Sequence, residues 1–313
     1  MTPDNIKNCN VVVVGSGGML GWEVVESLKS AGLKVAPLDI PLIDITKLES
    51  VRSVLGGIGS PGLLINCAAY TAVDEAESES EAAFAVNRDG PANLADECER
   101  LGIPLIHIST DYVFNGKSDR PYREEDAPDP INVYGRSKWE GEEAVRSRLA
   151  RHLIVRTSWL YGSRGLNFVK TMLKLGTERE ELKVVSDQYG CPTWSFDLAG
   201  CLIRIGERAL SGSEEVPWGT YHFCGEGITT WYHFAVAILD EARRGESARI
   251  ARVSPVPTSS YPTVAARPRY SALDCGKIGM SFGITPPPWK MSLASLIDGF
   301  YKSSGSADAR ERL

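Results

Sequence analysis

The sequence predicts an α/β protein: a Rossmann-type doubly wound parallel sheet with a smaller, irregular C-terminal substrate lobe. Two observations support this prediction. Short apolar, strand-like segments alternate with helix-like segments through the first half of the chain, which is the pattern of a parallel sheet covered by helices. A glycine-rich segment directly follows the first expected strand and precedes the first expected helix.

The composition is that of a folded, acidic protein. The chain has 313 residues, enough for about two domains, and a net charge of −6. Nucleic acid and membrane are therefore not expected as main partners, because both are bound through basic faces. No apolar stretch reaches the ~18 residues of a membrane span, and the N-terminal segment lacks the features of a signal peptide. These observations predict a cytoplasmic location.

Cysteine and histidine spacing gives no sign of a metal centre. The seven cysteines form no C-x-x-C pair, and the four histidines lack metal-ligand spacing. We expect neither a disulfide framework nor a metal site.

The elements of the first half follow from apolar patterning and from the residues that end each segment. Strands are expected at residues 11–14, 33–38, 63–65, 104–108 and 153–156, where short apolar runs occur. Helices are expected at residues 22–28, 81–100 and 138–151, with Gly32 and Gly102 ending the first two. Residues 119–132, rich in proline and acidic residues, are expected to form a loop over a cleft.

The pattern loosens beyond about residue 160, where turn-rich segments predict the irregular lobe. We expect a dinucleotide-binding domain over residues 1–160 and mainly a substrate-binding lobe over residues 161–313. Residues 195–212 are expected to return and pack on the first domain. The tail, residues 303–313, has low complexity and is expected to fray.

The glycine-rich segment predicts a dinucleotide site. Gly15, Gly18 and Gly21 form G-x-x-G-x-x-G, with Met19 and Leu20 between the last two glycines. Glycine permits the tight turn, the close approach of pyrophosphate and the packing of helix on strand. The N-terminus of the following helix offers N–H groups and partial positive charge to the phosphates.

An acidic residue at the end of the second expected strand bears on the choice of cofactor. Asp39 lies 18 residues after Gly21, where a carboxylate can bind a ribose 2′-hydroxyl and repel a 2′-phosphate, which favours NAD(H). Asp44 and Ile45 are candidates for the adenine side. Capping of a helix together with Thr46 is an equal alternative for Asp44.

Three residues predict carbonyl chemistry. Tyr134 and Lys138 form Y-x-x-x-K, which places both side chains on one face of a helix. A neighbouring ammonium is expected to lower the tyrosine pKa and make the phenol a proton donor at neutral pH. Thr110 ends a strand upstream, at the sheet edge where ligands bind in such folds. Together they fit hydride transfer to a carbonyl: Thr110 holds its oxygen, Tyr134 protonates it, and Lys138 also holds the nicotinamide ribose.

Longer strings resemble the dTDP-4-dehydrorhamnose reductases, a family of extended short-chain dehydrogenases/reductases. They occur in the family's order from residue 10 to about 300, and they are NCAAYTAVD (66–74), STDYVFNG (109–116), NVYGRSK (132–138), RTSWLY (156–161), SDQYGCPT (186–193), Arg267-Pro268 and Leu273-Asp274. The chain departs from the family at Met19, where glutamine is usual, and at Ser137, where threonine is commoner. Met19 bears on how the cofactor is seated.

The resemblance implies roles for particular residues. Tyr134 is the catalytic acid, with Lys138 as its partner. Sugar contacts are implied for Thr110, Asp111 and Trp159, cofactor contacts for Ala68, Ala69 and Tyr70, and an approach to the nucleotide diphosphate for Gln188 and Arg267. A core tryptophan is an equal alternative for Trp159, and a solvated loop cation is an equal alternative for Arg267.

The reaction implied by the resemblance is reduction of the C4 ketone of dTDP-4-dehydro-L-rhamnose to dTDP-L-rhamnose by NADH or NADPH. A homodimer, and magnesium at its contact, rest on the resemblance alone. Two alternatives stay open. One is a reductase of another 4-keto-6-deoxy sugar nucleotide, and the other is a non-catalytic, cofactor-binding regulatory subunit similar to the beta subunit of methionine adenosyltransferase.

Overall fold

The computed structural model describes residues 10–211, 216–244 and 252–303. At its centre lies a six-stranded parallel sheet with the strand order β10-β5-β4-β3-β1-β2. Its strands are β1 (Asn10–Val14), β2 (Lys34–Leu38), β3 (Pro61–Asn66), β4 (Leu105–Thr110), β5 (His152–Thr157) and β10 (Gly219–His222). The strand order reverses between β1 and β3, which leaves a crevice at their carboxyl ends.

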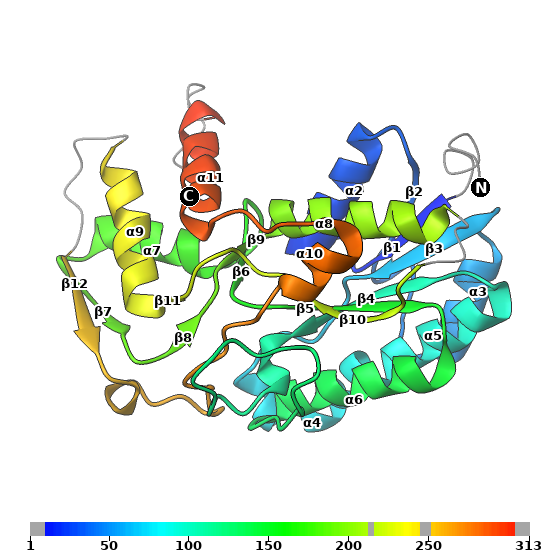
Figure 1. The fold of residues 1–313 in the computed structure, drawn as a ribbon, viewed down its shortest axis with the longest axis horizontal. Helices are drawn as coiled ribbons and strands as arrows, with labels where there is room; N and C mark the ends of the chain where they lie inside the picture. The colour runs from blue at the N-terminus through cyan, green and yellow to red at the C-terminus, as the bar shows by residue number, and fades with distance from the viewer. Residues whose placement is uncertain (1–9, 212–215, 245–251, 304–313) are drawn as a thin grey trace.

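Helices cover both faces of the sheet, as Figure 1 shows. One face carries α2 (Met19–Ser30) and α8 (Ser195–Leu210), with α10 (Gly276–Phe282) near β10. The other carries α3 (Leu48–Gly56), α4 (Ser80–Phe84), α5 (Gly90–Leu101) and α6 (Val133–Arg148). Successive residues of each strand point to opposite faces, so Val11 and Val13 pack in one layer and Val12 and Val14 in the other.

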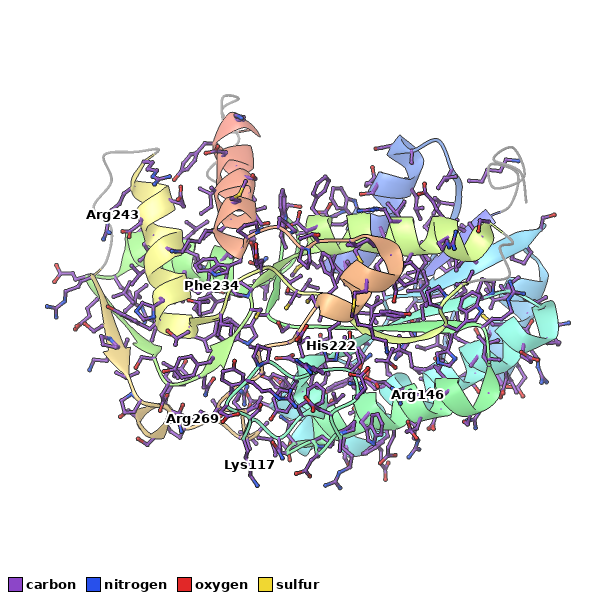
Figure 2. The ribbon with its side chains drawn as sticks, in the orientation of Figure 1. Lys117, Arg146, His222, Phe234, Arg243 and Arg269 are labelled. Atoms are coloured by element: carbon purple, nitrogen blue, oxygen red, sulfur yellow. The ribbon has the colours of Figure 1, made fainter. Side chains whose placement is uncertain are left out.

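A second group of elements packs beside the carboxyl edge of the sheet. Helices α7 (Phe168–Glu178), α9 (Trp231–Arg243) and α11 (Trp289–Ser303) surround the buried ring of Phe234, which Figure 2 labels. The two-stranded sheet of β7 (Glu181–Val185) and β12 (Arg252–Val256) joins this core. Two further pairs are β6 (Leu160–Tyr161) with β9 (Thr193–Trp194), and β8 (Tyr189–Gly190) with β11 (Thr229–Thr230).

The strands expected in the first half are confirmed, and residues 81–100 are helical as expected, but a π-helical turn interrupts the α-helix. That region contains α4, a π-helical turn (Ala85–Asp89) and α5. The turn points the Asn87 side chain at the loop after β3 and at α6. Helix α3, which the sequence did not predict, lies between β2 and β3.

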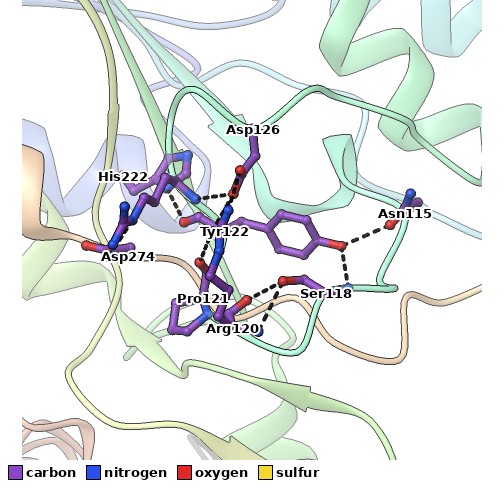
Figure 3. A network of polar contacts seen from close by, with 9 residues as sticks. Asn115, Ser118, Arg120, Pro121, Tyr122, Asp126, His222 and Asp274 are labelled. Atoms are coloured by element: carbon purple, nitrogen blue, oxygen red, sulfur yellow. Dashed lines mark hydrogen bonds and ion pairs between the residues drawn. The ribbon is translucent and has the colours of Figure 1, made fainter.

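The proline-rich loop of residues 119–132 is held against the end of β10 (Figure 3). The Tyr122 hydroxyl donates to Asn115 Oδ1 (2.9 Å) and accepts from the Ser118 N–H (3.2 Å), and the Tyr122 carbonyl contacts His222 Nδ1 (3.1 Å). The loop contributes Pro121 to a cavity of about 360 Å³. None of its residues lines the larger pocket described below.

A buried ion pair fastens α6 to the sheet. The Glu142 carboxylate accepts from Arg156 Nε (2.9 Å) and Nη2 (2.7 Å) on β5, and from the Ser109 hydroxyl (2.5 Å) on β4. Arg146, labelled on α6 in Figure 2, adds a further contact. Burial alone would raise the pKa of Glu142, but the two guanidinium groups and Ser109 outweigh it and lower this pKa to about 2.

The described residues contain no helix that is long and apolar enough to cross a membrane. Six cysteines are free thiols in the same part of the chain, and Cys9 lies outside it. Of the tail expected to fray (303–313), Ser303 ends α11, and residues 304–313 lie outside the described residues. Residues 1–9, on which the signal-peptide prediction partly rests, also lie outside them.

Replacing Glu142 tests this fastening. Glu142→Gln preserves side-chain volume but leaves the Arg156 guanidinium, 1 % exposed, without its counter-charge. We expect the free energy of unfolding to fall by about 3–5 kcal/mol, measured by chemical denaturation at neutral pH. The matched control is Glu143→Gln, whose side chain is 54 % exposed, with an expected change of about 0.5 kcal/mol or less. Equal effects of the two substitutions would contradict the fastening role.

Candidate active site

A pocket of about 480 Å³ opens at the carboxyl ends of the central strands. It brings together many of the residues singled out from the sequence. Its lining residues are Gly18, Met19, Leu20, Cys67, Ala69, Thr71, Val73, Ile108, Ser109, Thr110, Asp111, Tyr112, Tyr134, Lys138, Thr157, Ser158, Trp159, Leu160, Leu166 and Trp231.

The glycine loop forms one wall of this pocket, and its geometry fits a dinucleotide. Gly15 has a φ of +77°, and a Cβ there would lie 2.5 Å from the Ala68 N atom. A Cβ on Gly21 would overlap the Gly15 carbonyl oxygen. Helix α2 begins directly after Gly18, which has no side chain to cap it. The first N–H groups of α2 therefore have no side-chain cap, which suits them to bind an anion.

Met19 is the first residue of α2 and lines the pocket. It packs against the second group of elements, because a Cβ on Gly162 would lie 3.2 Å from Met19 Cγ. The thioether thus lies between the pocket and the chain segment after β6.

Asp39 braces the glycine loop from the end of β2. Its Oδ2 accepts from the Gly17 N–H (2.7 Å), and its Oδ1 accepts from the Ile40 N–H (2.8 Å). Asp44 accepts from the Thr46 N–H (3.1 Å) and hydroxyl (2.6 Å), so it closes a local turn. Ile45 is 6 % exposed and packs against Gly90. None of Asp39, Asp44 and Ile45 lines the pocket.

Helix α6 brings Tyr134 and Lys138 into the pocket one turn apart. Asn132 caps this helix by accepting from the Gly135 N–H (2.7 Å). Gly135 has to be a glycine, because a Cβ would overlap the Tyr112 carbonyl oxygen. The rings of Tyr134 and Tyr112 meet edge to face, with centroids 5.7 Å apart.

The expectation that Lys138 lowers the pKa of Tyr134 is wrong for this structure. Desolvation at the bottom of the pocket raises the pKa of Tyr134 to about 12, opposed by a hydrogen-bonding interaction with Thr110. Lys138 is turned aside, because its Nζ donates to the Ile108 carbonyl (2.6 Å). Burial lowers the pKa of Lys138 to about 8, against the attraction of Glu142.

Sequence reasoning missed Asn87, which positions the loop after β3. Its Oδ1 accepts from the Tyr70 N–H (2.9 Å), and its Nδ2 donates to the Tyr70 carbonyl (3.0 Å) and to the Ser137 hydroxyl (3.0 Å). This loop contains Ala68, Ala69 and Tyr70, of which Ala69 lines the pocket. The signal was Gly90-Pro91 inside the expected helix, since proline disrupts a helix interior.

Two stacked tryptophans form part of the pocket wall. Trp159 stacks on Trp231, with ring centroids 3.6 Å apart and an interplanar angle of 10°. Trp159 has a φ of +46°, in the left-handed region that a tryptophan rarely occupies. A Cβ on Gly190 would overlap its indole ring. Trp159 lines the pocket, and it also packs against the core around Phe234. Trp231, which also lines the pocket, was not predicted.

Two buried polar atoms in the pocket have no hydrogen-bond partner. They are Asp111 Oδ2 and Thr157 Oγ1. Buried polar groups in proteins are almost always hydrogen-bonded, so unpaired atoms on residues that line a pocket indicate a polar ligand. Thr157 was not a predicted site residue.

Gln188 and Arg267 do not line the pocket. Gln188 Nε2 donates to the Thr258 hydroxyl (3.2 Å). Arg267 forms a bidentate ion pair with Asp74 and is 19 % exposed, so it is not a solvated loop cation.

The described part of the chain holds no group of three or more His, Cys, Asp or Glu side chains that could bind a metal ion. The magnesium implied by the resemblance is therefore assigned to none of these residues, and no step is assigned to it.

Comparison with known proteins agrees with this geometry. A family model described as the RmlD substrate binding domain matches residues 9–302. The dTDP-4-dehydrorhamnose reductase of Aggregatibacter actinomycetemcomitans is 42% identical over 288 residues, covering 91% of this chain and 97% of that protein.

Solved structures give the same result. The crystal structure of Bacillus anthracis dTDP-4-dehydrorhamnose reductase in complex with NADP is 38% identical, with a TM-score of 0.86, and the match covers 93% of this chain and 99% of that chain. The Thermus thermophilus UDP-glucose 4-epimerase shares the fold at 21% identity and a TM-score of 0.75, over 92% of this chain and 98% of that chain. From its sequence and its fold, this chain belongs to the dTDP-4-dehydrorhamnose reductase family.

Proposed function

We propose that this protein reduces the C4 ketone of dTDP-4-dehydro-L-rhamnose to dTDP-L-rhamnose with NADH or NADPH. The observation that carries the proposal is the convergence of Thr110, Tyr134 and Lys138 in one pocket beside the glycine loop. The names of the relatives supply the substrate, and the pocket supplies groups suited to that chemistry.

The nicotinamide, when bound, supplies the hydride. The side chains then have to bind the carbonyl oxygen and protonate the alkoxide that forms on the sugar. Tyr134 is a protonated phenol at neutral pH, since its pKa is raised to about 12 by burial. A sugar alkoxide is a stronger base than phenolate, so proton transfer from Tyr134 to it is favourable. Thr110 directs its hydroxyl to the same oxygen.

Lys138 has donors left for the cofactor. An ammonium carries three N–H donors, and the Ile108 carbonyl takes one of them. The others bind the nicotinamide ribose and stabilise the phenolate that Tyr134 becomes. Lys138 is therefore an electrostatic partner of the deprotonated tyrosine, rather than the group that sets the pKa of the resting tyrosine.

The substrate lies between the strand ends and the tryptophan wall. Asp111 and Thr157 offer unpaired oxygen atoms to sugar hydroxyls, and Trp159, backed by Trp231, presents a flat apolar surface. Gln188 and Arg267 approach the nucleotide diphosphate from outside the pocket.

The glycine loop, with Gly15, Gly18, Met19, Leu20 and Gly21, binds the pyrophosphate of the cofactor. Further along the cofactor, Asp39 approaches the ribose, and Asp44 and Ile45 approach the adenine. Ala68, Ala69 and Tyr70 lie along the remaining edge of the cofactor. The Asp39 carboxylate decides the balance between NADH and NADPH, because it faces the loop that approaches the ribose 2′-position.

The organisation of the molecule completes the proposal. Residues 1–160 form the cofactor-binding part, with residues 195–212 packed onto it, and residues 161–313 mainly bind the substrate. The cytoplasmic location and the homodimer stay predictions, to be checked by cell fractionation and by the mass of the protein in solution.

Removing the phenolic hydroxyl tests the mechanism. We expect Tyr134→Phe to lower kcat at least about 100-fold, because the alkoxide loses its proton donor. Cofactor oxidation is followed by reduced-nicotinamide absorbance with dTDP-4-dehydro-L-rhamnose, and cofactor affinity, measured by fluorescence, is expected to stay unchanged. Tyr232→Phe, on α9 outside the pocket, is the matched control.

Retained turnover in Tyr134→Phe would contradict the assigned role. If the wild-type protein binds cofactor but does not oxidise it with this substrate, the proposed function fails. Turnover of another 4-keto-6-deoxy sugar nucleotide, or a co-purifying partner enzyme, would then identify one of the two alternatives.

Substituting Asp39 tests cofactor selectivity. In Asp39→Ala the negative charge at the glycine loop is lost, so a 2′-phosphate is no longer repelled. We expect the ratio of kcat/KM for NADPH to that for NADH to rise at least about tenfold, a difference of about 1.4 kcal/mol. The ratio separates selectivity from any general loosening of the loop. Glu49→Ala, on the exposed start of α3, is the control, and an unchanged ratio in Asp39→Ala would refute the assignment.

A further inference from the structure

Asp111 supplies a carboxyl group to the pocket, and the proposed reduction uses this group only as a sugar contact. Its side chain is buried, with the whole residue only 2 % exposed, at the end of β4. Oδ1 accepts a hydrogen bond from the Thr110 hydroxyl (3.0 Å). Oδ2 has no partner, because the nearby Ser271 hydroxyl donates to the Tyr189 carbonyl (3.4 Å) instead.

Thr110 connects Asp111 to the phenol. Its hydroxyl interacts with the Tyr134 side chain on one side and with Asp111 Oδ1 on the other. A hydroxyl can accept one proton while it releases another, so Tyr134, Thr110 and Asp111 form a continuous path for a proton. Asp111 lines the pocket, so the path ends where water enters when the product leaves.

We propose that Asp111 returns a proton to Tyr134 through Thr110 after each turnover. The inference rests on the proposed function and adds a recharging step to it.

The step balances in protons and bonds. The O–H bond of Tyr134 breaks as its proton goes to the sugar alkoxide, which leaves a phenolate. The Thr110 hydroxyl proton then moves to the phenolate, and the neutral Asp111 carboxyl passes its proton from Oδ1 to Thr110. Asp111 is left as a carboxylate and takes up one proton from water that enters the pocket. The sum is one proton from solvent per ketone reduced, which the reduction requires.

The surroundings of Asp111 suit a group that both holds and releases a proton. Desolvation raises its pKa to about 7, against the lowering effect of the hydrogen bond from Thr110. The titratable groups that face it are Tyr112 on its own turn, Tyr134 on α6 and Cys191 after β8. None of these is a cation that would hold the carboxyl in its ionised form. The carboxyl is therefore mostly neutral below about pH 7 and mostly ionised above it.

Pre-steady-state kinetics of Asp111→Asn test the relay. The first turnover uses the proton that Tyr134 already carries, whereas every later turnover requires its replacement. We expect a burst of cofactor oxidation close to one equivalent per site, followed by a steady-state rate at least about tenfold slower relative to the first turnover than in the wild type. The fall of wild-type kcat as the pH rises through about 7 is expected to disappear in this variant.

The matched control is Asp197→Asn. Asp197 is another partly buried carboxyl whose pKa is raised by desolvation, but it bonds to Ser292 outside the pocket. This variant is expected to keep the wild-type ratio of steady-state to first-turnover rate and the wild-type pH profile. Thermal unfolding and cofactor binding show whether each variant is folded.

Three outcomes separate the possibilities. If the first turnover slows together with later turnovers, or if only KM rises, Asp111 is a sugar ligand and the relay is refuted. An unaltered burst ratio and pH profile in Asp111→Asn refute it too, because Tyr134 is then recharged directly from solvent. Failure of the wild-type protein to reduce the ketone at all would be a failure of the proposed function, seen before any variant is made.

Discussion

The rest of the site depends on the buried carboxylate of Glu142. Helix α6 carries Tyr134, Lys138, Glu142 and Arg146 at four-residue intervals, so all four lie along one stripe of the helix. The first two line the pocket, and the third binds Arg156 and Ser109 on the sheet. A buried charge is tolerated only when it is paired and hydrogen-bonded, and here the pairing sets the height and rotation of the helix. The position of the Tyr134 phenol is therefore determined by the Glu142 ion pair, which lies about two helical turns further along α6.

This arrangement also explains which features could be predicted from the sequence. The strands at residues 11–14 and 153–156 were predictable because strands buried on both faces are continuous apolar runs. The spacing of Tyr134 and Lys138 was enough to place them on one helix face. Helix α6 nevertheless begins at Val133, five residues before Lys138, because Asn132 caps it there.

Other features depend on contacts between distant segments. The π-helical turn exists where Asn87 bonds to Tyr70 and Ser137, neither of which is near it in sequence. The expected direction of the Tyr134 pKa shift was wrong. The neighbouring lysine can be read from the sequence, but the complete desolvation of the hydroxyl and the bond from Lys138 to Ile108 cannot. Trp231 could be placed at the pocket only once the packing of the second group of elements was known.

The sheet is completed by a strand from late in the chain, and this has a consequence for synthesis. β10 pairs with β5, but the chain from Ser158 to Trp218 passes through α7, β7 and α8 before it returns. Closing so long a loop costs entropy, and pairing over such separations slows folding. Until His222 has left the ribosome, the outer edge of β5 has no partner, and an open strand edge is a template for aggregation. The nascent chain therefore passes through a stage in which this edge is open. Binding of a chaperone to the edge prevents more aggregation at that stage than after β10 has paired.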